Sequence, residues 1–308
     1  MTPEKVIIVK KKTQLEELLR RHATTSQVKF FLERRGESYQ FYQEAHQQYQ
    51  RSLQEIISTL PHTVRQQTVE KEHLSTFQFS DKDVIVAVGD PGLFVNVAKY
   101  VGEQPVIVIN PDVQRYDDTF TSCSLKDFSV VLQQILKGEA EVEALTMAEA
   151  RLEDGQTLYG LNDLFIGRNS HVSARYEISF DGKQERQSSS GIIVSTGTGS
   201  TGWLTSVMVG SYSLAARKLP TLDEFAFLRD ADYLVFAVRE PFPSRITGTT
   251  IVHGQVTVDN PLRIMSQMPE NGVIFSDGIE SDYLEFNSGR NVIIQPAEKK
   301  VYRVCGTK

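Results

Sequence analysis

The first half of the chain alternates short apolar runs with longer amphipathic patterns. The apolar runs at residues 6–9, 84–88 and 105–109 are β-branched and uninterrupted, which is typical of strands buried on both faces of a parallel sheet. A further strand is expected at residues 63–69, and helices at residues 14–23, 39–60, 92–101 and 125–138. The apolar stripe of the longest predicted helix comprises Tyr42, Ala45, Tyr49, Leu53, Ile56 and Ile57. Strands alternating with helices predict a doubly wound α/β domain.

After about residue 140 the pattern changes to alternation of apolar and polar residues between glycine-containing turns. Tyr176 and Ile178 alternate up to Asp181-Gly182, and Val256 and Val258 alternate up to residues 259–260. Both stretches predict hairpins. The expected fold class is therefore α/β plus all-β, with an N-terminal α/β nucleotide-binding domain at residues 1–140 and a C-terminal antiparallel β domain at residues 141–308. Whether the last residues return to the first domain is left open.

Length, charge and cysteine count narrow the choice of function. A chain of 308 residues exceeds the roughly 100 to 200 residues of one domain, so two are expected. The formal charge of -6 argues against nucleic acid or an anionic membrane as partner. Cys123 and Cys305 are far apart and have no metal-ligand spacing, so neither a disulfide framework nor a metal site is predicted. No apolar stretch approaches the ~18 residues of a membrane span, and a cytoplasmic protein is expected.

The turn after the strand at residues 84–88 is the first candidate for chemistry. Gly89, Asp90, Pro91 and Gly92 join that strand to a helix, where backbone N–H groups create a positive field and glycine permits close approach of a ligand. Asp90 is either the N-cap of the helix or a carboxylate aimed at a substrate hydroxyl. Pro91 suits the first helical position, because its missing N–H has no helical partner there.

A loop rich in hydroxyls and glycines is the second candidate. The apolar run at residues 192–194 leads into Ser195 and a stretch that ends in the only tryptophan. Such a loop offers hydroxyl and backbone donors for phosphate or ribose oxygens, although a plain surface loop is the alternative. The candidate residues in it are Thr196, Gly197, Thr198, Gly199, Ser200 and Trp203.

Two acidic turns complete the set of candidates. Asn162 and Asp163 lie between apolar residues and either form an ordinary turn or present an amide and a carboxylate at the start of a strand. Asp277 precedes Gly278 at a probable hairpin tip, for which a simple turn is the stronger interpretation. No Gly-x-Ser-x-Gly elbow or HExxH motif is present, so neither a serine hydrolase nor a metal-dependent hydrolase has support.

Taken in order, these pieces resemble the NAD kinase family, which shares a superfamily with the diacylglycerol and sphingosine kinases. The stretches at residues 88–92 and 195–203 and the Asn162-Asp163 pair are similar to that family's Gly-Gly-Asp-Gly-Thr turn, its Ser/Thr-Gly loop and its Asn-acid pair. The resemblance covers nearly the whole chain and is strongest to the mitochondrial-type branch. It implies a homodimer or higher homo-oligomer that binds NAD between its domains and transfers the γ-phosphoryl of ATP, with Mg²⁺, to the adenosine ribose 2'-hydroxyl.

The resemblance also implies roles for the candidate residues. Asp90 corresponds to the general base, Asn162 and Asp163 to residues that hold the NAD adenosine, and Lys11 to a residue that meets a phosphate. The nucleotide-binding positions it implies are Gly89, Gly92, Thr196, Gly197, Thr198, Gly199, Ser200, Trp203 and Asp277.

The chain departs from the family pattern at one turn. Gly-Gly-Asp-Gly-Thr has become Val-Gly-Asp-Pro-Gly, and Pro91 removes one backbone donor. This departure keeps a second function open, a catalytically lapsed protein that senses NAD or NADP. Lipid or sugar phosphorylation is a third, suggested only by the superfamily.

Overall fold

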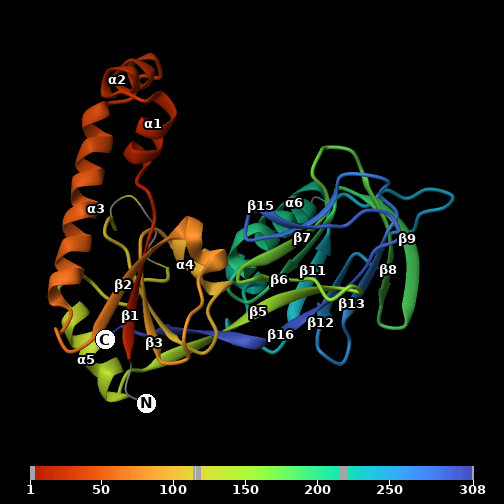
Figure 1. Ribbon diagram of the computed structural model, residues 1–308. Helices are drawn as coiled ribbons and strands as arrows, with labels where there is room; N and C mark the ends of the chain where they lie inside the picture. The colour runs from red at the N-terminus through yellow and green to blue at the C-terminus, as the bar shows by residue number, and fades with distance from the viewer. Residues whose placement is uncertain (1–3, 114, 116–118, 216–220, 307–308) are drawn as a thin grey trace. The chain divides into compact units, whose positions relative to one another are not determined.

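A computed structural model describes residues 4–113, 115, 119–215 and 221–306 of the chain. The chain divides into two compact units (Figure 1). The first unit runs to Glu143 and includes the chain again from Val301, while the second is Ala144–Lys300. Two long strands, β5 (Val142–Leu152) and β16 (Asn291–Val304), contain the boundaries.

The sheet of the first unit is parallel, as the alternation of strands and helices predicts. Its order is β2-β1-β3-β4, followed by the end of β16, where Tyr302 pairs with Pro105. Lys10 lies opposite both Glu70 and Val88, and Val88 lies opposite Ile109. The carboxyl ends of its strands therefore lie level at one edge. The strands are β1 (Lys5–Lys10), β2 (Arg65–Glu70), β3 (Asp83–Val88) and β4 (Pro105–Ile109).

Helices bury both faces of this sheet. Val6, Ile7, Ile8 and Val9 are all inaccessible to solvent, which explains the uninterrupted apolar run. One face packs against two of the helices through Leu53, Phe128 and other apolar residues. The helices are α1 (Gln14–His22), α2 (Thr25–Arg34), α3 (Tyr39–Thr59), α4 (Pro91–Ala98) and α5 (Phe128–Lys137), with a 3-10 turn η1 at Lys71–Thr76.

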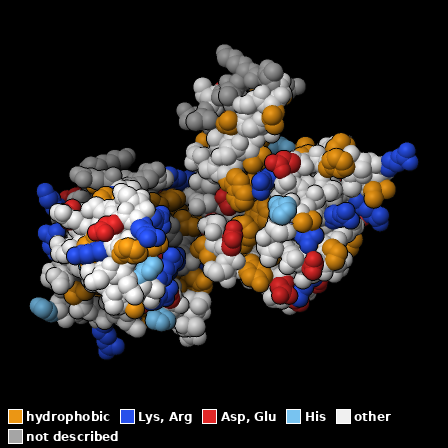
Figure 2. Space-filling view, turned by 90° about the horizontal axis from the view of Figure 1, so that it is seen from above, with side chains coloured by type: hydrophobic (Ala, Val, Ile, Leu, Met, Phe, Trp, Pro, Cys, Tyr) orange, Lys and Arg blue, Asp and Glu red, His pale blue; other side chains and the backbone are white. Residues whose placement is uncertain are grey.

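The helices α1 and α2 form a hairpin over the amino-terminal part of α3. Leu15, Val28 and Leu32 form its small core, and Thr13 and Glu16 make a capping box that starts α1. In Figure 2 blue Lys and Arg side chains gather at the left, where the view looks down on the ends of α1 and α2. In the apolar stripe of α3, Tyr49, Leu53 and Ile56 are buried, whereas Ile57 is 39% exposed.

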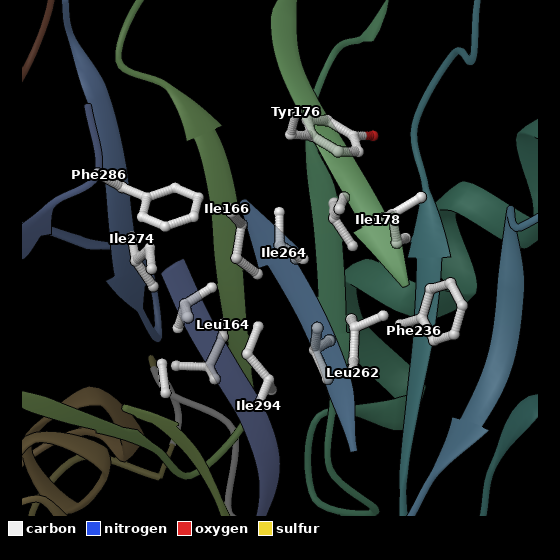
Figure 3. Packing of buried hydrophobic residues seen from close by; sticks show 14 of the residues in the cluster. Leu164, Ile166, Tyr176, Ile178, Phe236, Leu262, Ile264, Ile274, Phe286 and Ile294 are labelled. Carbon is white, nitrogen blue, oxygen red and sulfur yellow. The ribbon is translucent and has the colours of Figure 1, made fainter. Parts of the chain in front are cut away.

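The second unit is a β-sandwich. One layer joins β16, β13, β8 and β9, with β5 and β6 beside them, and the other has the order β12-β11-β10-β7-β14-β15. Their inner faces share one apolar core, to which Ile166, Tyr176, Phe236 and Ile264 contribute (Figure 3). The strands are β6 (Thr157–Gly160), β7 (Asp163–Arg168), β8 (Ala174–Phe180), β9 (Lys183–Ser189), β10 (Ile192–Ser195), β11 (Leu234–Val238), β12 (His253–Val256), β13 (Leu262–Ser266), β14 (Gly272–Ser276) and β15 (Ile279–Glu285).

Two of the three Asx-rich turns form hairpins. Asp181-Gly182 joins β8 to β9, and Asp277-Gly278 joins β14 to β15, with all four residues at positive φ. The hairpin expected around residues 259–260 is wrong: β12 pairs with β11, whereas β13 pairs with β8 and β16. Val258 is 61% exposed, because the chain crosses there from one layer of the sandwich to the other.

The remaining helical segments of the second unit follow β10. They are a π-helical turn η2 (Ser200–Leu204), α6 (Thr205–Leu214) and a 3-10 turn η3 (Leu222–Phe225). In the part of the chain that the structure describes, no helix is both long enough and apolar enough to cross a membrane. Cys123 and Cys305 are both free thiols.

Candidate functional site

In the first unit, polar residues follow the carboxyl ends of three neighbouring parallel strands. Lys11 follows β1, Gly89 and Asp90 follow β3, and Asp112 lies shortly after β4. Because these strand ends are level, the segments that follow them lie at the same edge of the sheet. Ligands of open parallel sheets bind at such an edge.

Asp90 does two things at this edge. Its Oδ1 accepts a hydrogen bond from the N–H of Leu93 at 3.1 Å, so it caps α4, and Pro91 occupies the first helical position. The N-cap interpretation is thus confirmed. Its Oδ2 forms an ion pair with the ammonium of Lys11, and the two side chains are 22% and 26% exposed. The pair is therefore reachable by a ligand.

The first turn of α4 has one amide left for a ligand. Pro91 has no N–H, and the N–H of Leu93 bonds to Asp90. The N–H of Gly92 makes no hydrogen bond to any described residue. It thus adds a donor beside the Lys11–Asp90 pair, at the positive end of the helix dipole.

A pocket opens at this edge of the sheet. It has about 580 Å³ of empty space, its mouth included, with Lys11 and Asp90 among its polar lining residues and Phe41 and Tyr42 from α3 among the aromatic ones. Arg115 also lines it: its guanidinium lies 4.0 Å from the centre of the Phe41 ring and donates to Asp112 at 2.9 Å. The pocket thus combines aromatic faces with a charged end.

In the second unit, the carboxylate of Asp277 organises the turn that precedes β7. Its Oδ1 accepts from the N–H groups of Asn162 and Asp163 at 2.7 and 3.2 Å, and its Oδ2 accepts from that of Leu161 at 3.1 Å. In return, the N–H of Asp277 donates to the carbonyl of Asp163 at 3.0 Å. A carboxylate that accepts several backbone N–H groups holds a turn rigidly, so the hairpin tip has a specific role.

Thr196 attaches the loop after β10 to the same turn. Its N–H donates to the carbonyl of Asn162 at 2.9 Å, and its hydroxyl donates to that of Leu161 at 2.5 Å. The hydroxyl of Ser200 donates to Gly197 at 2.8 Å within the loop. Thr196 and Ser200 are both inaccessible to solvent, so their hydroxyls stabilise the loop itself.

The loop glycines permit the chain to approach itself. A Cβ on Gly199 would lie 2.1 Å from the carbonyl oxygen of Asn162, and one on Gly197 would lie 1.9 Å from that of Leu228. No real Cβ tolerates such distances, and the opposing atoms are backbone, which cannot rotate away. The sequence attributes these glycines to ligand approach, whereas in the structure the close partner is the protein's own backbone.

Three polar groups around this turn are candidates for contact with a ligand. The hydroxyl of Thr198 is buried and has no partner in the described part of the chain, and the amide of Asn162 makes no side-chain hydrogen bond to a described residue. Burial and, secondarily, the charge of Asp277 raise the pKa of Asp163 to about 7. Perturbed carboxyl groups and unpaired polar groups are common at binding sites.

Trp203 lies next to this loop in an aromatic stack. Its ring lies 5.6 Å from that of Phe165 at an angle of 14°, and the guanidinium of Arg239 lies 5.3 Å from its centre. Phe165 in turn touches Phe275 at 4.8 Å. The single tryptophan therefore anchors the end of the loop to the outer face of β7 and β14.

The known proteins to which this chain is similar include several NAD kinases. The NAD kinase of Clostridium tetani is 25% identical over 211 residues, which is 66% of this chain and 68% of that protein. The NAD kinase of Paraburkholderia phymatum is 30% identical over 129 residues, 39% of this chain and 42% of its own. NAD kinase 2, mitochondrial, of Rattus norvegicus is 25% identical over 256 residues, 65% of this chain and 59% of its own.

The chain is thus similar to NAD kinases over about two thirds of its length. It spans less than two thirds of the length of most of the relatives it matches, and no family model matches it. The structure of yeast NADH kinase complexed with NADH superposes with a TM-score of 0.60 at 16% identity, over 100% of this chain and 85% of that one. An Archaeoglobus fulgidus NAD kinase in complex with ATP gives 0.57 at 17% identity, over 97% and 92%. The NAD kinase fold expected from the sequence is confirmed.

Within this NAD kinase fold, the candidate residues form one group in each unit. Lys11, Gly89, Asp90 and Gly92 share the sheet edge of the first unit. The second group surrounds the turn before β7 and comprises Asn162, Asp163, Thr196, Gly197, Thr198, Gly199, Ser200 and Asp277, with Trp203 beside it.

The sequence misses several residues of the first group. The sequence places Tyr42 in the apolar stripe of a helix and gives no reason to single out Phe41 or Arg115. All three side chains line the pocket. Tyr49 reaches the same edge with its hydroxyl. The available signal was the Tyr and Phe content of the first turns of α3, since ligand pockets are lined largely by hydrophobic and aromatic side chains. In the described residues, no cluster of three metal-ligating side chains occurs.

Proposed function

We propose that this NAD kinase relative transfers the γ-phosphoryl group of ATP to the 2'-hydroxyl of the adenosine ribose of NAD, which gives NADP and releases ADP. The observation that carries the proposal is the ion pair between Lys11 and Asp90 at the start of α4. A phosphoryl transfer to an alcohol needs a proton acceptor for the hydroxyl and positive charge for the phosphates. This sheet edge offers both within one contact.

The first unit supplies the groups for the donor and for the proton. Asp90 orients the acceptor hydroxyl and takes its proton late in a loose transition state. Lys11 and the N–H of Gly92 bind phosphate oxygens. The base of the donor nucleotide stacks on the aromatic wall made by Phe41 and Tyr42, which line the same pocket as Lys11. Mg²⁺ arrives with ATP as part of the substrate.

The second unit supplies recognition of the NAD adenosine. Asn162, Asp163 and Thr198 present an amide, a carboxyl and a hydroxyl that no described side chain uses. Asp277 and Thr196 fix the backbone from which these groups project. A protonated Asp163 can donate to a ring nitrogen of adenine, and an ionised one can accept from the exocyclic amine. Both forms are accessible near neutral pH, because its pKa is about 7.

The test is NADP formation from NAD, ATP and Mg²⁺ by the purified protein. Asp90→Asn keeps the N-cap, because Asn caps as well as Asp, and should lower kcat by roughly 10²- to 10⁴-fold. The matched control is Asp81→Asn, an exposed carboxylate of the same unit, which should leave kcat unchanged. A folded wild-type protein that forms no NADP under any tested donor would refute the proposal.

A sensor of NAD or NADP is the second candidate function, and the ion pair itself favours it. Lys11 already occupies one oxygen of Asp90, and Pro91 has removed one donor from the phosphate-binding turn. A sensor binds the dinucleotide without ATP. Calorimetry with NAD, NADP and ATP on the wild-type protein separates the two functions, because the kinase binds ATP and the sensor does not.

We also propose that two copies of the chain pair through the second unit. Val172, Phe242 and Ile246 are 50%, 63% and 77% exposed around one hollow that Arg186 and Glu240 also line. A patch that carries both arginines and carboxylates is self-complementary across a two-fold axis. Phe242→Ser with Ile246→Ser should therefore turn a dimer into a monomer in analytical ultracentrifugation, whereas a wild-type protein that sediments as a monomer would exclude pairing.

The cellular compartment remains a prediction. The composition favours the cytoplasm, whereas two of the relatives are named mitochondrial. Fractionation of the source cells decides between them.

A further inference from the structure

One stretch in the middle of α3 contacts the segments that follow three strands of the parallel sheet. The Nδ1 atom of His46 lies 2.9 Å from the hydroxyl of Thr13, after β1. Gln48 donates its amide to the carbonyl of Pro111, after β4, at 2.7 Å. Tyr49 contacts the ends of β1 and β3. These side chains lie on less than one and a half turns of helix, so one short stretch of α3 contacts the segments after β1, β3 and β4.

The hydroxyl of Tyr49 is the buried member of this group. It accepts a hydrogen bond from the N–H of Lys11 at 3.0 Å and donates one to the carbonyl of Val88 at 2.9 Å. The side chain is 7% exposed. Burial raises the pKa of Tyr49, so the phenol keeps its proton and can donate at any pH near neutrality.

These two bonds lie next to the Lys11–Asp90 pair in the sequence. One goes to Lys11 itself, and the other goes to a residue two positions before Asp90. Lys10 and Val88 are the last residues at which β1 and β3 pair with each other. The Tyr49 hydroxyl therefore bridges the backbones of β1 and β3 at the point where their backbone pairing ends.

From this geometry we infer that Tyr49 is a positioning residue. Its hydroxyl sets the distance between the backbone segments that carry Lys11 and Asp90, and so keeps the ammonium and the carboxylate in contact. The inference rests on the proposed function for its catalytic consequence. Its structural content, that the Tyr49 hydroxyl orders the ion pair, stands without it.

A purely structural role for Tyr49 predicts something different. The ring packs in the same core as Leu53 and Ile56, and phenylalanine would preserve that packing. Only the hydroxyl reaches Lys11 and Val88. If burial of the ring were its only contribution, Tyr49→Phe would leave the Lys11–Asp90 ion pair unchanged. A small displacement of reacting groups costs rate far more than it costs stability.

The experiment compares Tyr49→Phe with Tyr176→Phe. Tyr176 is a matched control, because its hydroxyl is also buried and bonded twice, to Gln187 at 3.0 Å and Ser189 at 2.6 Å, but in the core of the second unit. Both variants should lose similar stability. Only Tyr49→Phe should lower kcat, by roughly 10- to 100-fold, with the KM for NAD changed less than about twofold.

A second measurement keeps the inference testable if the wild-type protein forms no NADP. Acetic anhydride labels exposed lysine amines, and mass spectrometry follows each site. Tyr49→Phe should raise the labelling rate of Lys11 several-fold relative to the wild type, while Lys82, elsewhere in the same unit, serves as an internal reference. Absence of NADP in the wild type would then refute the proposed function alone. An unchanged Lys11 labelling rate in Tyr49→Phe would overturn the inference, and so would an equal loss of kcat in Tyr176→Phe.

Discussion

Asp277 and Asn162, which are 115 residues apart, are joined by a 2.7 Å hydrogen bond from the Asn162 N–H to the Asp277 carboxylate. Two more N–H groups of the same turn bond to that carboxylate. Asp277→Asn keeps the positive φ, because Asn adopts it as readily, but offers one acceptor oxygen in place of two. We expect a loss of about 1 to 3 kcal/mol in the free energy of unfolding, measured in urea.

The control for that substitution is Asp181→Asn. Asp181 has a φ of 50°, precedes a glycine at a hairpin tip, and is exposed with no side-chain bond to a described residue. It should change stability by less than about 0.5 kcal/mol. Equal effects of the two substitutions would show that the Asp277 carboxylate does not hold the turn.

The raised pKa of Asp163 predicts a pH dependence of stability. The folded pKa is about 7 and the unfolded one about 3.9, so the folded state binds more protons between these values. Stability contributed by this group is therefore present below about pH 4 and is lost as pH rises towards 7. Asp163→Asn should remove this slope and gain of the order of 1 to 4 kcal/mol at pH 7.5 relative to pH 4.

This pH effect is read from the difference between wild-type and variant curves, because other titrating groups contribute equally to both. Urea unfolding at pH 4, 5.5 and 7.5 suffices. Parallel curves over that range would mean that Asp163 titrates as an ordinary carboxyl.

Gly199 should not tolerate a methyl group. Its Cβ would lie 2.1 Å from a backbone oxygen, so Gly199→Ala must move the loop away from the Asn162 turn at a cost of about 1 to 3 kcal/mol. Gly210→Ala in α6 is the control, since no atom lies within 4 Å of its Cβ. It should be neutral or stabilise by up to about 1 kcal/mol, because alanine favours helix. Differential scanning calorimetry compares the two.

Thr196 and Thr198 should respond oppositely to valine. Thr196→Val removes a hydroxyl that bonds to Leu161, and should cost about 1 to 3 kcal/mol of stability. Thr198→Val removes a buried hydroxyl without a described partner, so stability should stay the same or rise. If that hydroxyl contacts NAD, the Kd should rise roughly 10- to 100-fold. The fluorescence of Trp203, the only tryptophan, can follow the titration.

The sequence predicts the strands and most helices because their apolar periods are unambiguous. Val6 to Val9 and the stripe containing Leu53 are buried as expected. Asp90 was open between two interpretations, and the structure shows that one carboxylate serves as cap and ion-pair partner at once. The sequence pattern could not show that Asp90 has both roles, because the second contact comes from Lys11, which is distant in the sequence.

Other features depend on contacts that no local pattern records. The α2 helix has only Val28 and Leu32 buried, so its apolar stripe is too short to stand out. Val256 and Val258 alternate with polar residues as in a hairpin strand. The strands on either side of this turn, β12 and β13, nevertheless pair in different layers of the sandwich. The partners of Gly197 and Gly199 are backbone atoms of the turn at Asn162 and the segment at Leu228, and the sequence shows only that small residues are needed.

The strand β16 ends in the first unit, where Val304 is fully buried in the core and Arg303 forms an ion pair with Glu143 at 2.7 Å. These residues are translated after all of the second unit. During translation, the edge of β4 therefore stays unpaired while the roughly 150 residues of the second unit are synthesised, until the end of β16 is available to pair with it. Folding of the amino-terminal half thereby depends on synthesis of residues 301–304, and a nascent chain stalled before residue 300 should need a chaperone to keep that edge from pairing with other molecules.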